Sequence, residues 1–173
     1  MRHSMCFGRG KRNDMKTDSP QKKPSLNLTS IFRCMMEEGY YPVFEQSYIQ
    51  FEMDDNLAVV EYEDGIASLR LFFSIDTEEC GLFMEASNIS MASTYSVKPV
   101  VLDDRENIMF CCEFFCDNLR EFRKFFPRAI NMMEEALAAH RTEIKKLVLA
   151  QEAAAKTIPA TEESMTGRRK IFS

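Results

Sequence analysis

The dipeptide Asp64-Gly65 constrains the fold most strongly, because it joins two segments with the composition of β-strands. A two-residue type I′ turn needs a positive φ at both central positions, which Asp and Gly tolerate well. Residues 57–62 before the turn are rich in β-forming side chains, and from 69 to 75 every second residue is apolar. The sequence therefore predicts an antiparallel hairpin at this point.

The rest of the chain between 25 and 150 divides into further strands and helices. Strands are expected at 48–53, 97–102 and 108–115, and helices from 25, over 77–92 and over 118–147. The order is helix, three strands, helix, two strands, helix, with strands and helices segregated enough for the α+β class. We expect an antiparallel sheet of about five strands, one face covered by helices and the other partly exposed.

The helix boundaries follow from capping residues and breakers. Ser25 or Asn27 is expected to cap the first helix, and Thr77 the second. The buried stripe of the second helix is expected to include Ile89, at helical spacing from the apolar residues before it. The last and longest amphipathic helix is expected to kink or restart at Pro127.

Charge and composition divide the chain into three parts. Residues 1–24 carry seven Lys/Arg against two Asp, which gives +5, and this segment is expected to be a disordered basic tail. Residues 25–150 are the expected domain, and 151–173 a flexible tail along which the last helix frays. Since the net charge of the whole chain is −5, everything after residue 24 carries −10, which disfavours a nucleic-acid reader.

The cellular location is expected to be the cytoplasm. No stretch has the roughly 20 apolar residues that span a bilayer, and the basic start lacks the apolar centre of a signal peptide. We therefore expect no membrane partner. Met15 could also be the true start, which leaves open whether residues 1–14 belong to the native protein.

No catalytic or metal site stands out among the reactive residue types. Cys111, Cys112 and Cys116 lie in an apolar run without nearby histidine, so we expect reduced, buried thiols rather than a zinc site. His140 lies on the apolar stripe of the last helix and is expected in the core or at its boundary. Glycine-rich phosphate loops are absent. The sequence therefore predicts a non-enzyme without cofactor or metal.

Three stretches resemble a known family in their order and spacing. They are Glu38-Gly39-Tyr40, residues 83–90 followed by Val97-Lys98, and Glu113-Phe114-Phe115 followed by Phe122 and residues 126–129. Over roughly residues 26–147 the chain resembles the YbjN-like family, whose fold resembles that of type III secretion chaperones. Met91 departs from the family pattern, in which a second asparagine often follows the one at Asn88.

The resemblance implies a non-catalytic bacterial binding domain of poorly defined role, often described as a regulator of sensory transduction. By analogy with the secretion chaperones it also implies that the domain could form a homodimer. Fold likeness alone does not transfer function.

Apolar side chains left over after the core is assigned are the main indication of function. Phe72 shares the polar face of its strand with Arg70, and Phe114 and Phe115 occupy both faces of another strand. Contiguous exposed apolar area usually marks a partner surface. We therefore expect a protein-binding or regulatory, chaperone-like module, whose partner is another protein or a second copy, with these four residues as candidates for the binding face.

Two other functions stay open. A small-ligand protein or an unrecognised enzyme would use a pocket with converging polar groups, for which Asn88, Lys98 and Glu113 are the candidates. A nucleic-acid-associated regulator acting through basic tails is the least favoured, because the domain is acidic.

Overall fold

The computed structural model describes residues 26–157. The expected tail 1–24 and all but the first seven residues of the expected tail 151–173 lie outside these residues. The elements are α1 (Leu28–Glu37), β1 (Val43–Phe44), β2 (Ile49–Met53), β3 (Asn56–Glu63), β4 (Ile66–Ser74), the 3₁₀ turn η1 (Thr77–Glu79), α2 (Cys80–Met91), β5 (Val97–Val101), β6 (Asn107–Phe115) and α3 (Leu119–Thr157).

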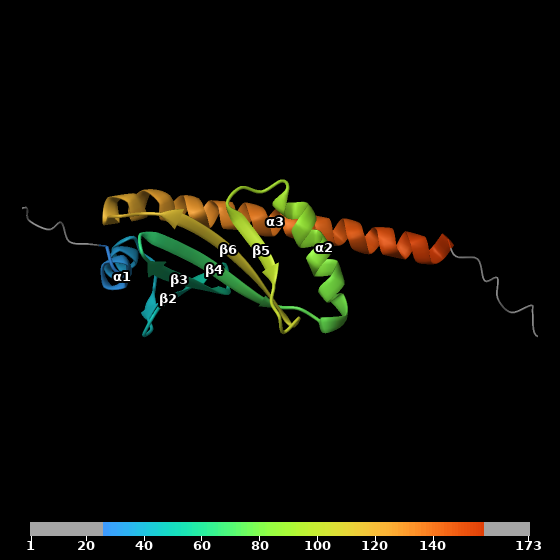
Figure 1. Cartoon of the computed structure of the whole chain (residues 1–173), viewed down its shortest axis with the longest axis horizontal. Coiled ribbons are helices and arrows are strands. Elements are labelled where there is room, and N and C mark those ends of the chain that lie inside the picture. Colours follow the sequence, from blue (N-terminus) through green and yellow to red (C-terminus); the bar gives the residue numbers. More distant parts are fainter. Residues whose placement is uncertain (1–25, 158–173) are drawn as a thin grey trace, which may run out of the picture.

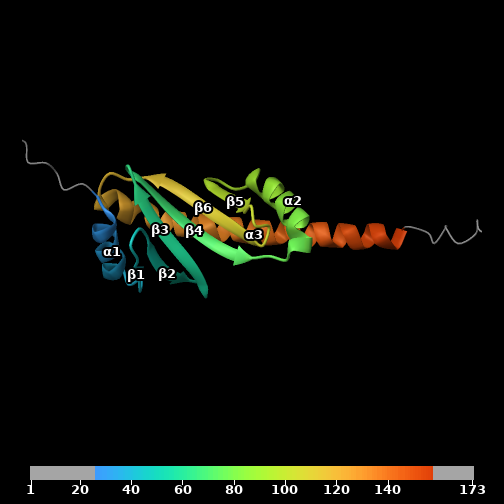
Figure 2. The ribbon, with the colours of Figure 1, turned by 60° about the horizontal axis from the view of Figure 1, so that its bottom comes forward.

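The strands form one antiparallel sheet in the order β1-β2-β3-β4-β6-β5 (Figure 2). The α+β class and the antiparallel sheet are confirmed, but the sheet has six strands where about five were expected. The additional strand is β1, which has only two residues, and Val43 pairs with Gln50 and Phe44 with Ile49. A strand of two residues is defined by its pairing with β2 and is too short to show a periodic pattern in the sequence.

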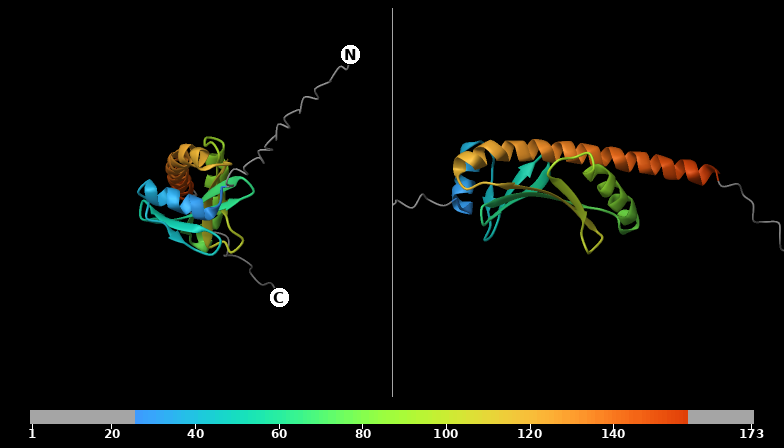
Figure 3. Two further views of the ribbon diagram at one scale, coloured as in Figure 1. Left: turned by 90° about the vertical axis from the view of Figure 1, so that its left-hand side faces the viewer. Right: turned by 45° about the horizontal axis from the view of Figure 1, so that its top comes forward.

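The helices lie on one side of the sheet (Figures 1 and 3). The long α3 runs the length of the molecule, packing against β6, with α1 against it near one end and α2 farther along. Alternate side chains of the strands point into the core beneath them, such as Leu69 and Leu71 of β4, which are fully buried. Phe122 and Phe126 of α3 stack in this core with ring centroids 4.8 Å apart.

The turns between neighbouring strands have the expected geometry. Asp64 and Gly65 have φ angles of 49° and 84°, as a type I′ hairpin requires, and they join β3 to β4. The turn between β2 and β3 is built in the same way, from Asp54 and Asp55 at φ 47° and 62°.

The structure selects between and corrects the expected helix caps. Asn27, one of the two expected residues, caps α1 and accepts a hydrogen bond from the backbone N–H of Ser30, whereas Ser25, the other, lies outside the described residues. Asp76, not Thr77, provides the cap before α2, because its carboxylate accepts from the N–H of Glu78 at 3.1 Å and starts a 3₁₀ turn.

The stripe expected along α2 is also partly wrong. Ile89 is 41% exposed, whereas Ser87 and Ser90 are buried. Their hydroxyls donate to the backbone carbonyls of Phe83 and Ser87, so the polar groups stay hydrogen-bonded inside the helix.

Helix α3 is continuous from Leu119 to Thr157, so the restart expected at Pro127 does not occur. Proline costs the helix one backbone hydrogen bond. The buried neighbours Phe126 and Ala129 hold this stretch against the rest of the core. The helix also continues past residue 150, where fraying was expected, because residues 151–156 are all strong helix formers.

Candidate functional site

The candidate site is the open face of the sheet, the side opposite to α2 and α3, with α1 at one end of the sheet (Figure 2). Among residues 26–157 no helix covers this face. Side chains alternate along each strand, so Arg70 and Phe72 of β4 point to the open face while Leu69 and Leu71 point to the core. The candidate residues can therefore be assigned to a face from the strand register.

A polar belt crosses the middle of the open face. Arg70 forms an ion pair with Glu61 at 2.9 Å, and its Nε donates to the hydroxyl of Ser68 at 3.1 Å. Beside them, Lys98 pairs with Glu113 at 3.1 Å, and this contact raises the pKa of the Lys98 ammonium. Both cations of the belt are thus already neutralised by carboxylates of neighbouring strands.

An apolar row lies on one side of the polar belt. Phe72 is opposite Met109, and Met109 is opposite Val100 on its other side. Leu57 lies next to Phe72, since its neighbour Ala58 pairs with Leu71. The exposed fractions are 42% for Phe72, 42% for Val100 and 57% for Leu57, so these three side chains are accessible to solvent.

A second apolar group lies on the other side of the belt. Ile66 and Phe115 are opposite each other and are 38% and 80% exposed. Phe114 points the other way and packs in the core, with its ring centroid 6.1 Å from that of Phe122 and 6.5 Å from that of Phe125. Of the four predicted partner residues, the structure places Phe72, Arg70 and Phe115 on the open face and Phe114 on the opposite face.

The three polar candidates do not meet in one place. Lys98 and Glu113 are ion-paired on the open face, whereas Asn88 lies exposed on α2, which packs on the helical side of the sheet. A pocket built from all three is therefore not formed.

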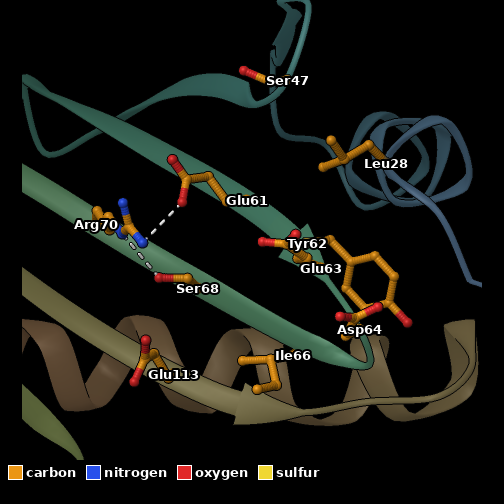
Figure 4. Close-up of a pocket in the computed structure, with 10 residues that line it drawn as sticks. All are labelled: Leu28, Ser47, Glu61, Tyr62, Glu63, Asp64, Ile66, Ser68, Arg70 and Glu113. Carbon is orange, nitrogen blue, oxygen red and sulfur yellow. Dashed lines mark hydrogen bonds and ion pairs between the residues drawn. The ribbon is translucent and has the colours of Figure 1, made fainter.

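A hollow of about 690 Å³ opens at the end of the open face nearest to α1 (Figure 4). Its walls come from α1, from the loop before β2, and from β3, β4 and β6, and it is lined by Leu28, Ser47, Glu61, Tyr62, Glu63, Asp64, Ile66, Ser68, Arg70 and Glu113. Four carboxylates face a single guanidinium, so the hollow is acidic. The sequence analysis missed it because residues from five segments build it, and no local motif marks such a site.

Tyr62 fixes one wall of this hollow to the end of β6. Its hydroxyl donates to the backbone carbonyl of Cys116 at 3.2 Å. Burial and the nearby negative charges of Asp117 and Asp64 raise the pKa of Tyr62, so the phenol stays protonated and keeps donating this hydrogen bond.

Two of the buried thiols are held in their unreactive, protonated form. Burial raises the pKa of Cys112 and of Cys116 to about 11, so both thiols are protonated at neutral pH. His140 is buried and its Nε2 lies 3.2 Å from the hydroxyl of Ser87. Among residues 26–157 no group of three His, Cys, Asp or Glu could hold a metal ion, and every buried side-chain nitrogen or oxygen has a partner.

Within the described part of the chain, none of the helices has an apolar stretch of the length that crossing a bilayer requires.

Several solved structures are similar to this fold, and two of them illustrate the likeness. YbjN from E. coli, described as a proposed transcription regulator, matches with a TM-score of 0.58 and 11% identity, over 70% of this chain and 94% of that chain. An uncharacterized protein from Methanothermobacter thermautotrophicus matches with a TM-score of 0.51 and 14% identity, over 70% of this chain and 98% of that one. The YbjN-like fold expected from the sequence is confirmed. No protein-family model and no curated protein matches the sequence.

Proposed function

We propose that this chain of YbjN-like fold is a non-catalytic, cytoplasmic regulatory module that binds an extended segment of a partner protein on the open face of its sheet. The observation that carries the proposal is the apolar row of Leu57, Phe72, Met109 and Val100 on the face that the helices leave uncovered, in which Met109 is half-buried and the other three are exposed. Apolar surface gathered in this way usually marks a protein interface.

The layout of the open face supports an extended partner. The row crosses β3, β4, β6 and β5, and with strands about 4.8 Å apart it is roughly 14 Å long. An extended segment of about four residues has this length. The polar belt with Arg70 and Glu61 lies alongside, so a bound segment would meet an apolar strip bordered by hydrogen-bonding groups, as in many interfaces.

The similar structure of YbjN supports the regulatory part of the proposal. YbjN of E. coli is described as a proposed transcription regulator, and at 11% identity this likeness concerns the fold. The acidic domain of the present chain disfavours direct contact with nucleic acid, so we propose that regulation acts through protein contacts.

The small-ligand alternative has one supporting observation. The volume of the hollow, about 690 Å³, lies within the range of ligand pockets. However, Arg70, the single cation in its lining, is already paired with Glu61, so no converging set of unpaired polar groups of both signs is available there. The partner-segment proposal accounts better for the exposed apolar side chains.

The test compares Phe72→Ser with the matched control Ile89→Ser in the full chain. Both residues are about equally exposed, at 42% and 41%, but Ile89 lies on α2 on the other side of the sheet. A partner captured by the wild-type chain and purified should bind Phe72→Ser about tenfold or more weakly, since an apolar contact of this size contributes about 1.5–3 kcal/mol. Titration calorimetry measures the affinity. Equal affinity for both variants would remove the open face from the proposed function.

A further inference from the structure

The acidic hollow at the end of the open face lies beside the start of α1, because Leu28 is part of its lining. We propose that the basic segment preceding the domain, residues 1–24, docks in this hollow and covers that end of the open face. The proposal concerns contact within one molecule, and it stands independently of the partner proposed above.

The charges that line the hollow favour a cationic occupant. Glu61 is paired with Arg70 and Glu113 with Lys98, so two of the four carboxylates are already compensated. Glu63 and Asp64, at the tip of the β3–β4 hairpin, form no ion pair with any residue between 26 and 157. Two negative charges at the mouth of the hollow are therefore available to lysine or arginine side chains.

The basic segment joins the domain at the same place. Leu28, the first residue of α1, lines the hollow, and Leu26 just before it is buried in the core. These two contacts anchor the start of the described chain beside the hollow (Figure 4). Lys22 and Lys23 are four and three residues from Leu26, so an extended chain places them within roughly 10–14 Å of it.

Charge and tethering act together on this contact. The segment carries seven Lys/Arg against two Asp, opposite in sign to the hollow. Because the segment is covalently attached, its effective concentration near the hollow is on the order of millimolar, so the contact avoids most of the entropic cost of bringing two separate molecules together. The hollow shares Ile66 and Arg70 with the open face, and an occupied hollow therefore narrows the surface left for a partner.

The first test is carbodiimide crosslinking of the full chain, which joins a lysine amine to a carboxylate in direct contact. In an equimolar mixture of unlabelled and ¹⁵N-labelled protein, mass spectrometry should find links from Lys22 or Lys23 to Glu63 or Asp64, both ends carrying the same isotope. The yield should fall about threefold or more between about 0.05 M and about 0.5 M NaCl, because salt screens exposed charges. Links with mixed isotopes would show contact between molecules and overturn the proposal.

A second measurement uses variants that keep the turn. Glu63→Gln with Asp64→Asn removes the two charges, and Asn-Gly suits a type I′ turn as well as Asp-Gly does. Trypsin should then cleave after Lys16 and Lys22 about threefold or more faster than in the wild-type chain, because the docked segment is released. Glu134→Gln with Glu135→Gln, exposed on α3, is the matched control and should leave these rates unchanged. Equal rates in all three proteins would overturn the proposal.

The Phe72→Ser variant separates this contact from the partner site. Phe72 does not line the hollow, so its substitution should leave the Lys22 and Lys23 crosslinks intact while partner binding falls. Unchanged partner affinity with intact crosslinks would contradict the partner proposal alone, and loss of the crosslinks would contradict the docking proposal alone.

Discussion

His140 is an ionisable side chain held in an apolar contact between α2, α3 and β6. Its ring lies 5.8 Å from that of Phe83 and 5.1 Å from that of Phe110. The hydroxyl of Ser87 donates to the carbonyl of Phe83, which leaves its oxygen to accept from Nε2–H of His140. Burial lowers the pKa of His140, so the folded state keeps the imidazole neutral.

This arrangement predicts a stability that falls in mildly acidic solution. The unfolded chain binds a proton at His140 near pH 6.5 and the folded chain only at lower pH. The contribution is therefore complete above about pH 6.5 and is lost as the pH falls from there through the folded pKa. Urea unfolding at several pH values between 7 and 5 should show a flatter pH dependence for His140→Gln than for the wild-type chain. Parallel curves would contradict this assignment.

Two cysteine thiols make a second prediction at the residue scale. With the pKa of Cys112 and of Cys116 at about 11, neither forms thiolate at pH 8. A pulse of iodoacetamide should modify both only in urea, as read by mass spectrometry of the peptides. Rapid modification of either thiol in the native protein would contradict the burial described here.

At the scale of elements, two glycines have opposite roles. Gly65 has a φ of 84°, and a Cβ at this position would lie 3.2 Å from a carboxylate oxygen of Asp117. Gly81 lies in the first turn of α2 with nothing within 4 Å of such a Cβ. The first glycine is required by the hairpin and the second is not.

The Gly65→Ala and Gly81→Ala substitutions should therefore change stability in opposite directions. Gly65→Ala should destabilise the protein by about 1–2 kcal/mol through the strained left-handed backbone. Gly81→Ala should stabilise it by about 0.4–1 kcal/mol, because alanine is the better helix former and restricts the unfolded chain. Denaturant unfolding measures both, and a destabilising Gly81→Ala would contradict the open surroundings of this residue.

Elements with a strong local signal were predictable from the sequence. The Asp64-Gly65 hairpin follows from the φ angles that such a turn demands, and the stripe through Phe122 and His140 follows from helical spacing. Tertiary contacts decide what was missed: Ser87 is buried where α2 packs on α3, and its hydroxyl lies 3.2 Å from Nε2 of His140. The strand at Val43–Phe44 exists only through its pairing with β2.

The candidate site was predictable only strand by strand. Alternation along β4 places Phe72 and Arg70 together on the open face, as expected. Predicting the hollow would require the register between the strands and the position of Leu28 relative to the sheet. No local sequence pattern gives either of these. Phe114 was a candidate because it is apolar, but side chains alternate between the two faces along β6, and this alternation directs Phe114 toward Phe122 in the core.

At the scale of the whole molecule, α3 is longer than the domain that it covers. The last buried residue on this helix is His140, and none of residues 141–156 is buried. The end of the helix extends beyond the sheet and the other helices (Figure 1). Because local stability follows buried contacts, amide hydrogen exchange measured by mass spectrometry should be faster over 141–157 than over 122–140. Equal protection along the helix would show that its last turns are covered in solution, for example by a second molecule.

The two borders of the sheet limit how copies of this molecule can join. β1 offers only two residues, and β5, at the other border, contains Pro99, which has no N–H to donate to an incoming strand. Growth of a continuous sheet from one molecule into the next is therefore disfavoured at both ends. Such a protein can expose apolar side chains on the face of its sheet while its edges resist the strand pairing from which fibrils grow.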